Sequence, residues 1–473
     1  MLFNSITFIL FFIIVLIIHY SPINWRFKKI SLLIGSYIFY AAWNPAFVIL
    51  LFLSTFADWH LAKKIFVCEH KSQRKRWLVL SLIFNLGLLS IFKYSGFLLD
   101  NVQSILHLFG INSQFTDPGI ILPMGISFYT FQTLSYTLDV YSKKLKPANS
   151  FLDYSLFVSF FPQLVAGPIV RARDFLPQLK HQHHISFNVF SIGISLFIIG
   201  LFEKTVLADA MFAPIVNEVF VEGTQPDMLS AWLGGWFFYG QIFCDFAGYS
   251  LCAIGCALCL GFKLPLNFRS PFAALGFADL WRRWHISLSS WLRDYLYIAL
   301  GGNKIGRYKT LRNLMITMVL GGLWHGAAWT FIIWGILHGL YLVIERGIKQ
   351  IKFLKNIGTY NIIRYILIFI TFLFVMLAFV IFRADNVNQA MQIYAGMIGL
   401  GETRQIITWN LWIQLATLTF ITLTLIQWIF RSKDLIEVIQ STSVITKSVV
   451  LSFLLIMIIT SSGNSDAFIY FQF

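Results

Sequence analysis

The chain has 473 residues, of which 58% are hydrophobic, 17% aromatic and only 12% charged. An average soluble domain carries about 25% charged residues, so this composition excludes an ordinary soluble globule. The many aromatic residues also exclude a disordered chain. The net charge of +15 comes from short basic clusters between apolar runs, which is typical of cytoplasmic loops and not of a nucleic-acid-binding surface. We therefore expect an all-α polytopic membrane protein.

Apolar runs long enough to cross a bilayer, about 20 residues, recur along the whole chain. A basic cluster at residues 26–29 follows the first run, 2–20, and predicts that the N-terminus lies outside. The later runs are 31–61, 78–99, 119–140, 154–169, 185–206, 229–262, 311–344, 362–382, 411–430 and 444–461. We expect about 11–13 transmembrane or re-entrant helices in one integral-membrane domain, residues 1–473, with its catalytic core at about 120–345.

The cysteines and the histidine-rich loop do not predict a metal site. Cys252, Cys256 and Cys259 share one helix face, where small residues let helices pack closely. This interpretation is preferred over a metal or redox site. Residues 181–184 hold three histidines in a basic polar loop without a nearby carboxylate or cysteine pattern, which indicates a solvated loop.

Two apolar segments carry prolines and glycines together with polar side chains. Residues 122–132 include Tyr129 and Gln132, and residues 160–169 include Gln163. Polar groups at membrane depth are costly unless they are paired or line a cavity, and irregular backbone is tolerated only where protein buries it or water reaches it. The segments are interpreted either as re-entrant linings of a cavity or as kinked helices held by hydrogen bonds.

Residues 281–294 predict an amphipathic helix, because aromatic and leucine residues recur at helical spacing. The apolar stripe comprises Trp281, Trp284, Leu288, Trp291 and Tyr295. Another face carries Arg282, His285, Ser289 and Arg293. This helix either lies on the membrane surface or lines a basic cavity suited to an anionic substrate.

A histidine in an apolar stretch is the strongest catalytic candidate. His325 stands between Trp324 and Gly326, and imidazole is the commonest general acid or base near neutral pH. The alternative is a histidine that only makes packing hydrogen bonds. His338 follows 13 residues later, and there the structural interpretation is preferred.

These motifs resemble the membrane-bound O-acyltransferase (MBOAT) family. Its WHG motif matches Trp324-His325-Gly326, and its RWH motif matches Arg283-Trp284-His285. Five blocks are similar to the alginate O-acetylation branch of the family: 122–141, 160–171, 245–255, 320–339 and 379–391. The D-alanyl-transfer branch is also similar around both histidine motifs. Around Asp245 this chain is less polar than the alginate branch.

The resemblance implies helices around a central funnel or tunnel and acetyl-CoA as the acyl donor, with no permanently bound cofactor. His325 corresponds to the invariant histidine of the family and is expected to act as general base, while His285 corresponds to a second histidine. The other residues expected to bind substrate or line the tunnel are Trp324, Gly326, Arg282, Arg283, Trp284, Ser289, Gln163, Tyr129 and Gln132.

The resemblance also implies a bacterial inner-membrane protein that passes the acetyl group to an extracytoplasmic partner protein. That partner would acetylate hydroxyls of an exopolysaccharide such as alginate, with peptidoglycan and teichoic acid as alternative acceptors. From the residues alone, a transporter or flippase for a glycan or lipid-linked sugar is the rival, because broken helices with buried polar groups also characterise transporters.

Overall fold

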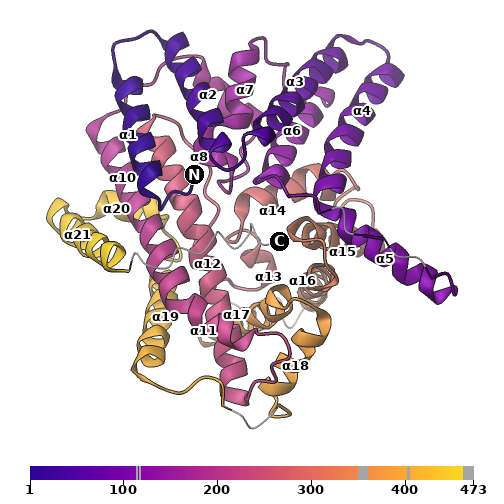
Figure 1. Cartoon of the computed structure of the whole chain (residues 1–473), viewed down its shortest axis with the longest axis vertical. Helices are drawn as coiled ribbons and strands as arrows, with labels where there is room; N and C mark the ends of the chain where they lie inside the picture. The colour runs from indigo at the N-terminus through magenta and orange to yellow at the C-terminus, as the bar shows by residue number, and fades with distance from the viewer. Residues whose placement is uncertain (113–114, 117–118, 350–360, 402–404, 462–473) are drawn as a thin grey trace. The chain divides into compact units, whose positions relative to one another are not determined.

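The computed structural model describes residues 1–112, 115–116, 119–349, 361–401 and 405–461. These residues form helices and connecting loops without a strand, as Figure 1 shows, and this confirms the all-α prediction. The chain divides into two compact units. The first comprises Met1–Ile194 and Cys252–Pro265, and the second Ser195–Leu251 and Leu266–Phe473. That the whole chain is one domain stays a prediction.

The first unit contains the N-terminal helices. They are α1 (Ile6–Tyr20), α2 (Trp25–Ala41), α3 (Ala46–Val67), α4 (Lys71–Leu89), the π-helical η1 (Ser90–Tyr94), α5 (Ser95–Leu108), α6 (Ile126–Tyr141), α7 (Phe151–Ser159), α8 (Phe161–Leu164), α9 (Ala172–Phe175), the 3₁₀ turn η2 (Leu176–Leu179) and the first half of α10 (Phe187–Phe202), whose second half belongs to the second unit.

The second unit contains most of the remaining helices. They are the π-helical η3 (Glu203–Phe212), α11 (Ala213–Val219), α12 (Met228–Cys259, whose last turns belong to the first unit), η4 (Pro271–Ala273), α13 (Phe277–Leu280), α14 (Ile286–Leu292), η5 (Arg293–Tyr297), α15 (Arg307–His325), α16 (Trp329–Ile348), α17 (Asn361–Arg383), α18 (Val387–Met397), α19 (Leu411–Ile429), α20 (Leu435–Ser441) and α21 (Val444–Thr460).

Seven helical segments among the described residues are long and apolar enough to cross a membrane. They are Ala46–Val67, Lys71–Leu108, Phe187–Val219, Met228–Cys259, Trp329–Ile348, Ile362–Arg383 and Leu411–Ile429. Two shorter apolar helices, Ile6–Tyr20 and Val444–Thr460, accompany them. The sequence predicted about 11–13 crossing or re-entrant segments. The number of long spans among the described residues is smaller because several of the apolar runs form short or interrupted helices.

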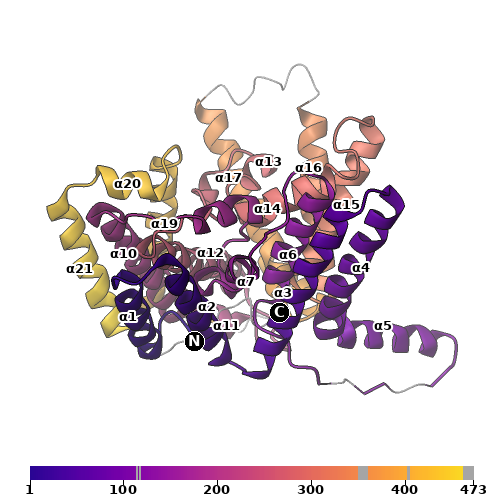
Figure 2. The same ribbon diagram turned by 90° about the horizontal axis from the view of Figure 1, so that it is seen from above.

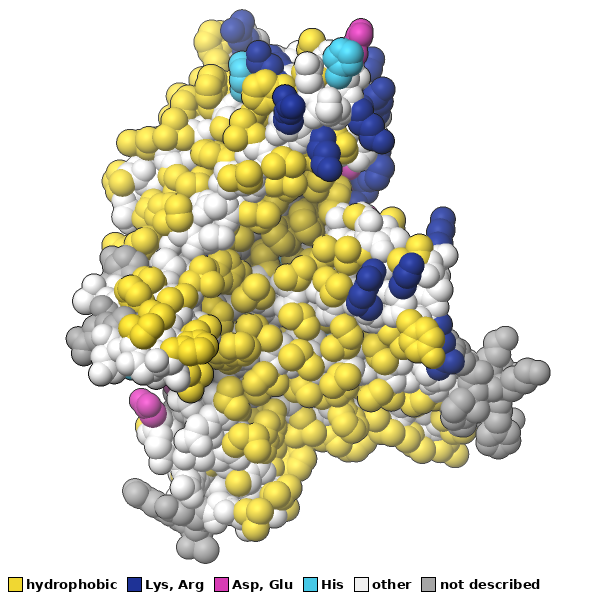
Figure 3. Space-filling model, turned by 90° about the vertical axis from the view of Figure 1, so that its right-hand side faces the viewer, with side chains coloured by type: hydrophobic (Ala, Val, Ile, Leu, Met, Phe, Trp, Pro, Cys, Tyr) yellow, Lys and Arg dark blue, Asp and Glu magenta, His cyan; other side chains and the backbone are white. Residues whose placement is uncertain are grey.

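The exterior is that of a protein surrounded by lipid. Figure 3 shows a face covered mostly by hydrophobic side chains, with Lys and Arg gathered toward its upper and right-hand edges. A continuous apolar surface of this kind marks contact with a membrane. The prediction of an integral membrane protein is thereby supported by the surface as well as by helix length.

Buried polar side chains join three helices of the first unit. The carboxylate of Asp58 on α3 accepts hydrogen bonds from Ser81 (2.7 Å) and Asn85 (2.9 Å) on α4. The hydroxyl of Thr133 on α6 donates to the Asn85 side-chain oxygen at 3.1 Å. Buried polar groups are stabilising only when they are paired, so this network fixes how α3, α4 and α6 pack.

The segment 122–132 begins with non-helical backbone and continues into α6. Gly125 has φ +77° and α6 begins directly after it. A Cβ atom at Gly125 would lie 2.5 Å from the carbonyl oxygen of Leu164. The two proline- and glycine-containing segments of the sequence therefore pack directly against each other in the first unit, and only glycine fits at this contact.

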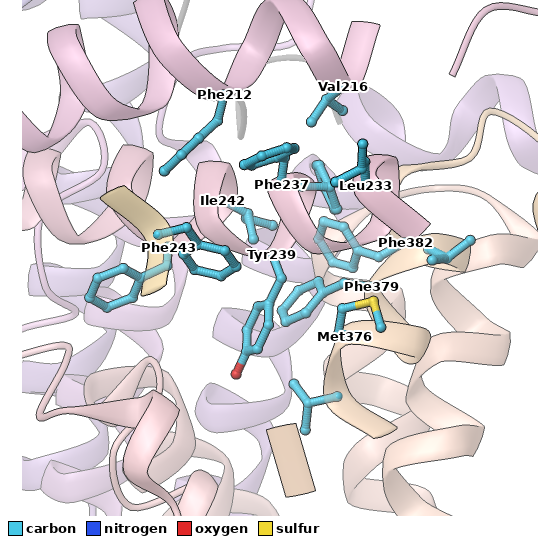
Figure 4. Close-up of a cluster of buried hydrophobic side chains, with 14 of the residues drawn as sticks. Phe212, Val216, Leu233, Phe237, Tyr239, Ile242, Phe243, Met376, Phe379 and Phe382 are labelled. Atoms are coloured by element: carbon cyan, nitrogen blue, oxygen red, sulfur yellow. The ribbon is translucent and has the colours of Figure 1, made fainter. Parts of the chain in front are cut away.

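An aromatic core fills the centre of the second unit. Figure 4 shows side chains from η3, α11, α12 and α17 that point toward one another, among them Phe237, Tyr239, Phe379 and Phe382. The rings of Tyr239 and Phe379 are stacked at 5.2 Å between centroids. Large buried aromatic surfaces of this kind hold helices in fixed positions.

Helices α15 and α16 form a tight antiparallel pair, as Figures 1 and 2 show. Glycines make the close approach possible, because a Cβ at Gly322 would lie 2.2 Å from the carbonyl oxygen of Phe331. A Cβ at Gly335 would lie 2.5 Å from the carbonyl oxygen of Met318. Small residues at such contacts are the usual basis of helix packing in membranes.

We expect Gly335→Ala to destabilise the protein by about 1–3 kcal/mol, because the added methyl group overpacks the contact between α15 and α16. Gly347 lies on the same helix with nothing within 4 Å of its Cβ position, so Gly347→Ala is the matched control and should not lower stability. Thermal unfolding of both variants in detergent measures the difference. Equal melting temperatures for the two variants would contradict this account of the helix pair.

Candidate active site

His325 is the last residue of α15 and is almost fully buried, at 3% exposure. The chain turns sharply after it, and α16 begins at Trp329. A Cβ at Gly326 would lie 2.0 Å from the ring of Phe331. Glycine is therefore needed at position 326 because a larger side chain would collide with the Phe331 ring. Its backbone is extended, a conformation that any residue can adopt.

Aromatic rings surround the His325 imidazole. Its ring centroid lies 5.1 Å from that of Trp324 and 5.1 Å from that of Trp334 on α16. Phe382 on α17 lies 5.4 Å away. These three rings give His325 an apolar environment, in which a lasting positive charge on the imidazole is unfavourable.

The structure corrects the predicted helix at 281–294. α13 ends at Leu280, and His285 has φ +43°, a left-handed conformation that interrupts the helix before α14 begins at Ile286. The peptide N–H of Ile286 donates to the carbonyl oxygen of Asn267 at 2.9 Å. Non-glycine residues adopt this backbone conformation rarely, and it persists only where the surrounding structure imposes it.

His285 lies fully buried beside His325, so the structure brings the histidines of the two motifs together. Their ring centroids are 6.2 Å apart, and the ring of Phe246 on α12 meets His285 edge-on at 4.6 Å. Burial lowers the pKa of His285 to about 3, which keeps this imidazole neutral at physiological pH.

An ion-pair network holds the loop that carries His285. The Asp279 carboxylate accepts from Arg283 at 2.9 Å and from Arg431 at 2.6 Å. Burial by itself raises the pKa of Asp279, but the Leu275 N–H and the two guanidinium groups together hold that pKa below its ordinary value. Arg283 is thus engaged with internal partners, whereas Arg282 is exposed to solvent.

Trp284 and Ser289, the other predicted site residues of this loop, stabilise its fold. The Ser289 hydroxyl donates to the carbonyl oxygen of Trp284 at 3.1 Å. The Trp284 ring packs against Phe268 at 5.1 Å and Phe379 at 5.2 Å. Their predicted contact with substrate stays a prediction.

Tyr129, Gln132 and Gln163 belong to the first unit. The side-chain amide of Gln163 donates to the carbonyl oxygen of Phe157 at 2.5 Å. The Tyr129 hydroxyl and the Gln132 side-chain oxygen are buried without a hydrogen-bond partner among the described residues. Their role as lining of a tunnel stays a prediction.

A buried ion cluster includes Asp245 on α12, the residue that precedes Phe246, whose ring contacts His285. The ammonium group of Lys204 is 2.7 Å from Asp209 and 2.6 Å from Asp245. A Cβ at Gly248 would lie 2.8 Å from the Lys204 backbone nitrogen. Sequence reasoning noted the acidic residues but missed this pairing, because Lys204 and Asp245 lie on different helices.

The described residues contain no group of three or more His, Cys, Asp or Glu side chains placed to hold a metal ion. The structure adds Trp334, Phe382 and Phe246 to the surroundings of the two histidines. Trp334 and Phe382 lie in the blocks 320–339 and 379–391, and the similarity of those blocks to the alginate branch was the only sequence feature that pointed to these two residues. Which aromatic rings contact the histidines depends on how the helices pack, and the spacing of residues in the sequence does not predict that packing.

The family model of the membrane-bound O-acyltransferases (MBOAT) matches residues 146–384. The probable alginate O-acetylase AlgI of Azotobacter vinelandii is 40% identical over 403 residues, which cover 85% of this chain and 79% of that protein. The peptidoglycan O-acetyltransferase of Helicobacter pylori is 38% identical, over 85% of this chain and 80% of its own length. The teichoic acid D-alanyltransferase of Streptococcus thermophilus is 30% identical, over 55% of this chain and 68% of its own length.

We expect acid to destabilise the wild type more than the variant His285→Asn. Below pH 6.5 the unfolded imidazole binds a proton while the buried one stays neutral until about pH 3, so this histidine contributes stability above pH 6.5 that is lost as the pH falls. The difference amounts to about 2 kcal/mol at pH 5. Asparagine is chosen because it tolerates the left-handed backbone.

Thermal unfolding in detergent at pH 7.5 and pH 5 measures this effect. The control is His184→Asn in an exposed loop, which should follow the wild type. The prediction fails if His285→Asn loses as much stability at pH 5 as the wild type does.

Proposed function

The chain belongs to the membrane-bound O-acyltransferase family, and we propose that it is an acetyl-CoA-dependent O-acetyltransferase of the bacterial inner membrane. It takes the acetyl group from cytoplasmic acetyl-CoA and delivers it, through an extracytoplasmic partner protein, to hydroxyls of an alginate-type exopolysaccharide. The observation that carries the proposal is the pair of buried histidines, 6.2 Å apart between ring centroids.

In the proposed reaction His325 is the general base. A ring nitrogen lone pair of His325 accepts the proton of an acceptor hydroxyl while the hydroxyl oxygen attacks the thioester carbonyl carbon. The new C–O bond forms, the C–S bond breaks, and the imidazolium returns its proton to the departing thiolate. The products are an acetyl ester and the free thiol of CoA.

His285 is proposed to stabilise the oxygen of the attacked carbonyl. A neutral imidazole has one N–H group that can donate a hydrogen bond, and the lowered pKa keeps His285 in that form. A donor fixed in a water-poor site stabilises developing negative charge strongly. The left-handed backbone at His285 and its bonded neighbour Ile286 hold this donor in place.

The relatives support alginate as the first acceptor to test. The relatives named for alginate are similar to this chain over most of both sequences, as is the relative named for peptidoglycan, so peptidoglycan is the alternative acceptor. The relative named for teichoic acid D-alanylation is similar over a shorter part. We further propose that the N-terminus lies outside, because the basic cluster at residues 26–29 favours a cytoplasmic loop.

We expect His325→Ala to reduce thiol release from acetyl-CoA by about 10²–10⁴-fold, because it removes the general base. The measurement uses purified protein in nanodiscs, with and without the partner protein and a polysaccharide acceptor. His285→Ala should also reduce kcat. His184→Ala, in an exposed loop, is the control and should release thiol at the wild-type rate.

Equal turnover by His325→Ala and the wild type, at matched folded amounts, would refute the proposed role of His325. A wild type that releases no thiol under any condition, but moves a glycan or lipid-linked sugar across the membrane, would favour the transporter.

A further inference from the structure

Three aromatic side chains of the second unit, Trp281, Trp334 and His338, present polar ring atoms that no group of the described residues satisfies. Both indole Nε1 atoms and both ring nitrogens of His338 are buried and have no hydrogen-bond partner among the described residues. Trp334 and His338 are each 1% exposed. Buried polar atoms in native proteins are nearly always paired with protein, water or ligand, so this concentration requires an explanation.

The three rings contact one another and reach the candidate active site. His338 lies 4.5 Å from Trp334 and 5.2 Å from Trp281 between ring centroids. Trp334 in turn lies 5.1 Å from His325. Because Trp334 and His338 are four residues apart on α16, they share one face of that helix. The unsatisfied nitrogens thus form one continuous group that begins next to the proposed general base.

The hydrogen-bonding capacity of this group selects its ligand. An indole N–H only donates, whereas a neutral imidazole offers one donor and one acceptor. The group therefore supplies three donors and one acceptor. A carboxylate or phosphate would bring a buried charge without a cationic partner at these rings, which is costly. A neutral ligand with several acceptor lone pairs and an N–H group, such as a secondary amide, matches this capacity.

The position of the rings along α16 indicates which neutral ligand this is. Beyond His338 the end of the helix carries the cation Arg346, while Lys349 is ion-paired with Glu345. From Trp334 to Lys349 the helix rises by about 22 Å, since each residue adds about 1.5 Å. The rings thus lie between His325 and a basic helix end that suits phosphate groups. In CoA, the arm between the phosphates and the thioester carries secondary amides.

We propose that Trp281, Trp334 and His338 form a subsite that binds the amide-bearing arm of the acyl donor. This inference rests on the proposed function, because it assumes a CoA thioester as the donor. Within it, His338 is a binding residue that contacts the arm and takes no part in proton transfer. The subsite sets where the arm lies and thereby brings the thioester carbonyl to the two histidines.

The main test compares His338→Phe with the wild type. Phenylalanine keeps the ring and removes both nitrogens, so the KM for acetyl-CoA should rise about three- to tenfold, the effect of one or two lost hydrogen bonds, while kcat stays within about twofold. His338→Gln restores a donor and an acceptor and should recover part of the loss. Trp428→Phe is the control, since its indole already donates to the carbonyl oxygen of Phe272 at 3.0 Å.

A second substrate separates amide binding from a general disturbance of the site. S-Ethyl thioacetate carries the thioester but no amide, so His338→Phe should leave its kcat/KM unchanged. An equal loss of kcat/KM with both thioesters would overturn the subsite, because the substitution at His338 would then act through His325 and not through the amides. A change in the KM of the polysaccharide in place of that of acetyl-CoA would overturn it too, since the rings would then bind the acceptor.

Direct binding tests the subsite even if the proposed function fails. Calorimetry with pantetheine, which carries the amides but no phosphoanhydride, should show binding to the wild type that is about three- to tenfold weaker in His338→Phe. Wild type that releases no thiol from acetyl-CoA but binds pantetheine in this way would refute the proposed function and keep the subsite. Wild type that does not bind pantetheine, or binds it as well as His338→Phe does, would overturn the subsite.

Discussion

The arrangement of the candidate site depends on the close approach of α15 and α16. Without side chains at Gly322 and Gly335, the backbones of the two helices come into direct contact. This contact sets His325, at the end of α15, against Trp334 on α16. It also carries His338, one turn further along α16, into the same group of rings. In lipid the hydrophobic effect does not drive helices together, so packing of this tightness is what fixes the site.

Charged groups and neutral polar groups have different surroundings inside the second unit. Several buried or part-buried charges are paired, as Lys204 is with Asp209 and Asp245 and as Asp279 is with Arg283 and Arg431. The side chains around the two histidines are instead aromatic, and the polar atoms there are neutral ring nitrogens. A paired cluster stabilises the scaffold, whereas neutral donors and acceptors suit the uncharged thioester and amides of the proposed acyl donor.

The sequence predicted the features that depend on local chemistry. Composition indicated a helical membrane protein, and proline with glycine located the break at Gly125. The motifs shared with the family identified both His285 and His325 as candidate site residues. The helix expected at 281–294 was wrong, because spacing cannot show that Asn267 bonds to Ile286 and that His285 takes a left-handed backbone. The pairing of Lys204 with Asp245 and that of Asp279 with Arg431 were also missed, since the members of each pair lie far apart in the sequence.

Charge balance explains how such an enclosed site can carry out acyl transfer. In the proposed reaction, the hydroxyl proton that His325 accepts returns to the departing thiolate, so neither a proton nor an anion is left among the aromatic rings. An imidazolium among Trp324, Trp334 and Phe382 is costly, and that cost favours rapid return of the proton. His285 contributes as a neutral donor because burial keeps its pKa near 3. A second charged group beside His325 would stabilise the imidazolium and slow the return, so the aromatic enclosure is itself part of the proposed mechanism.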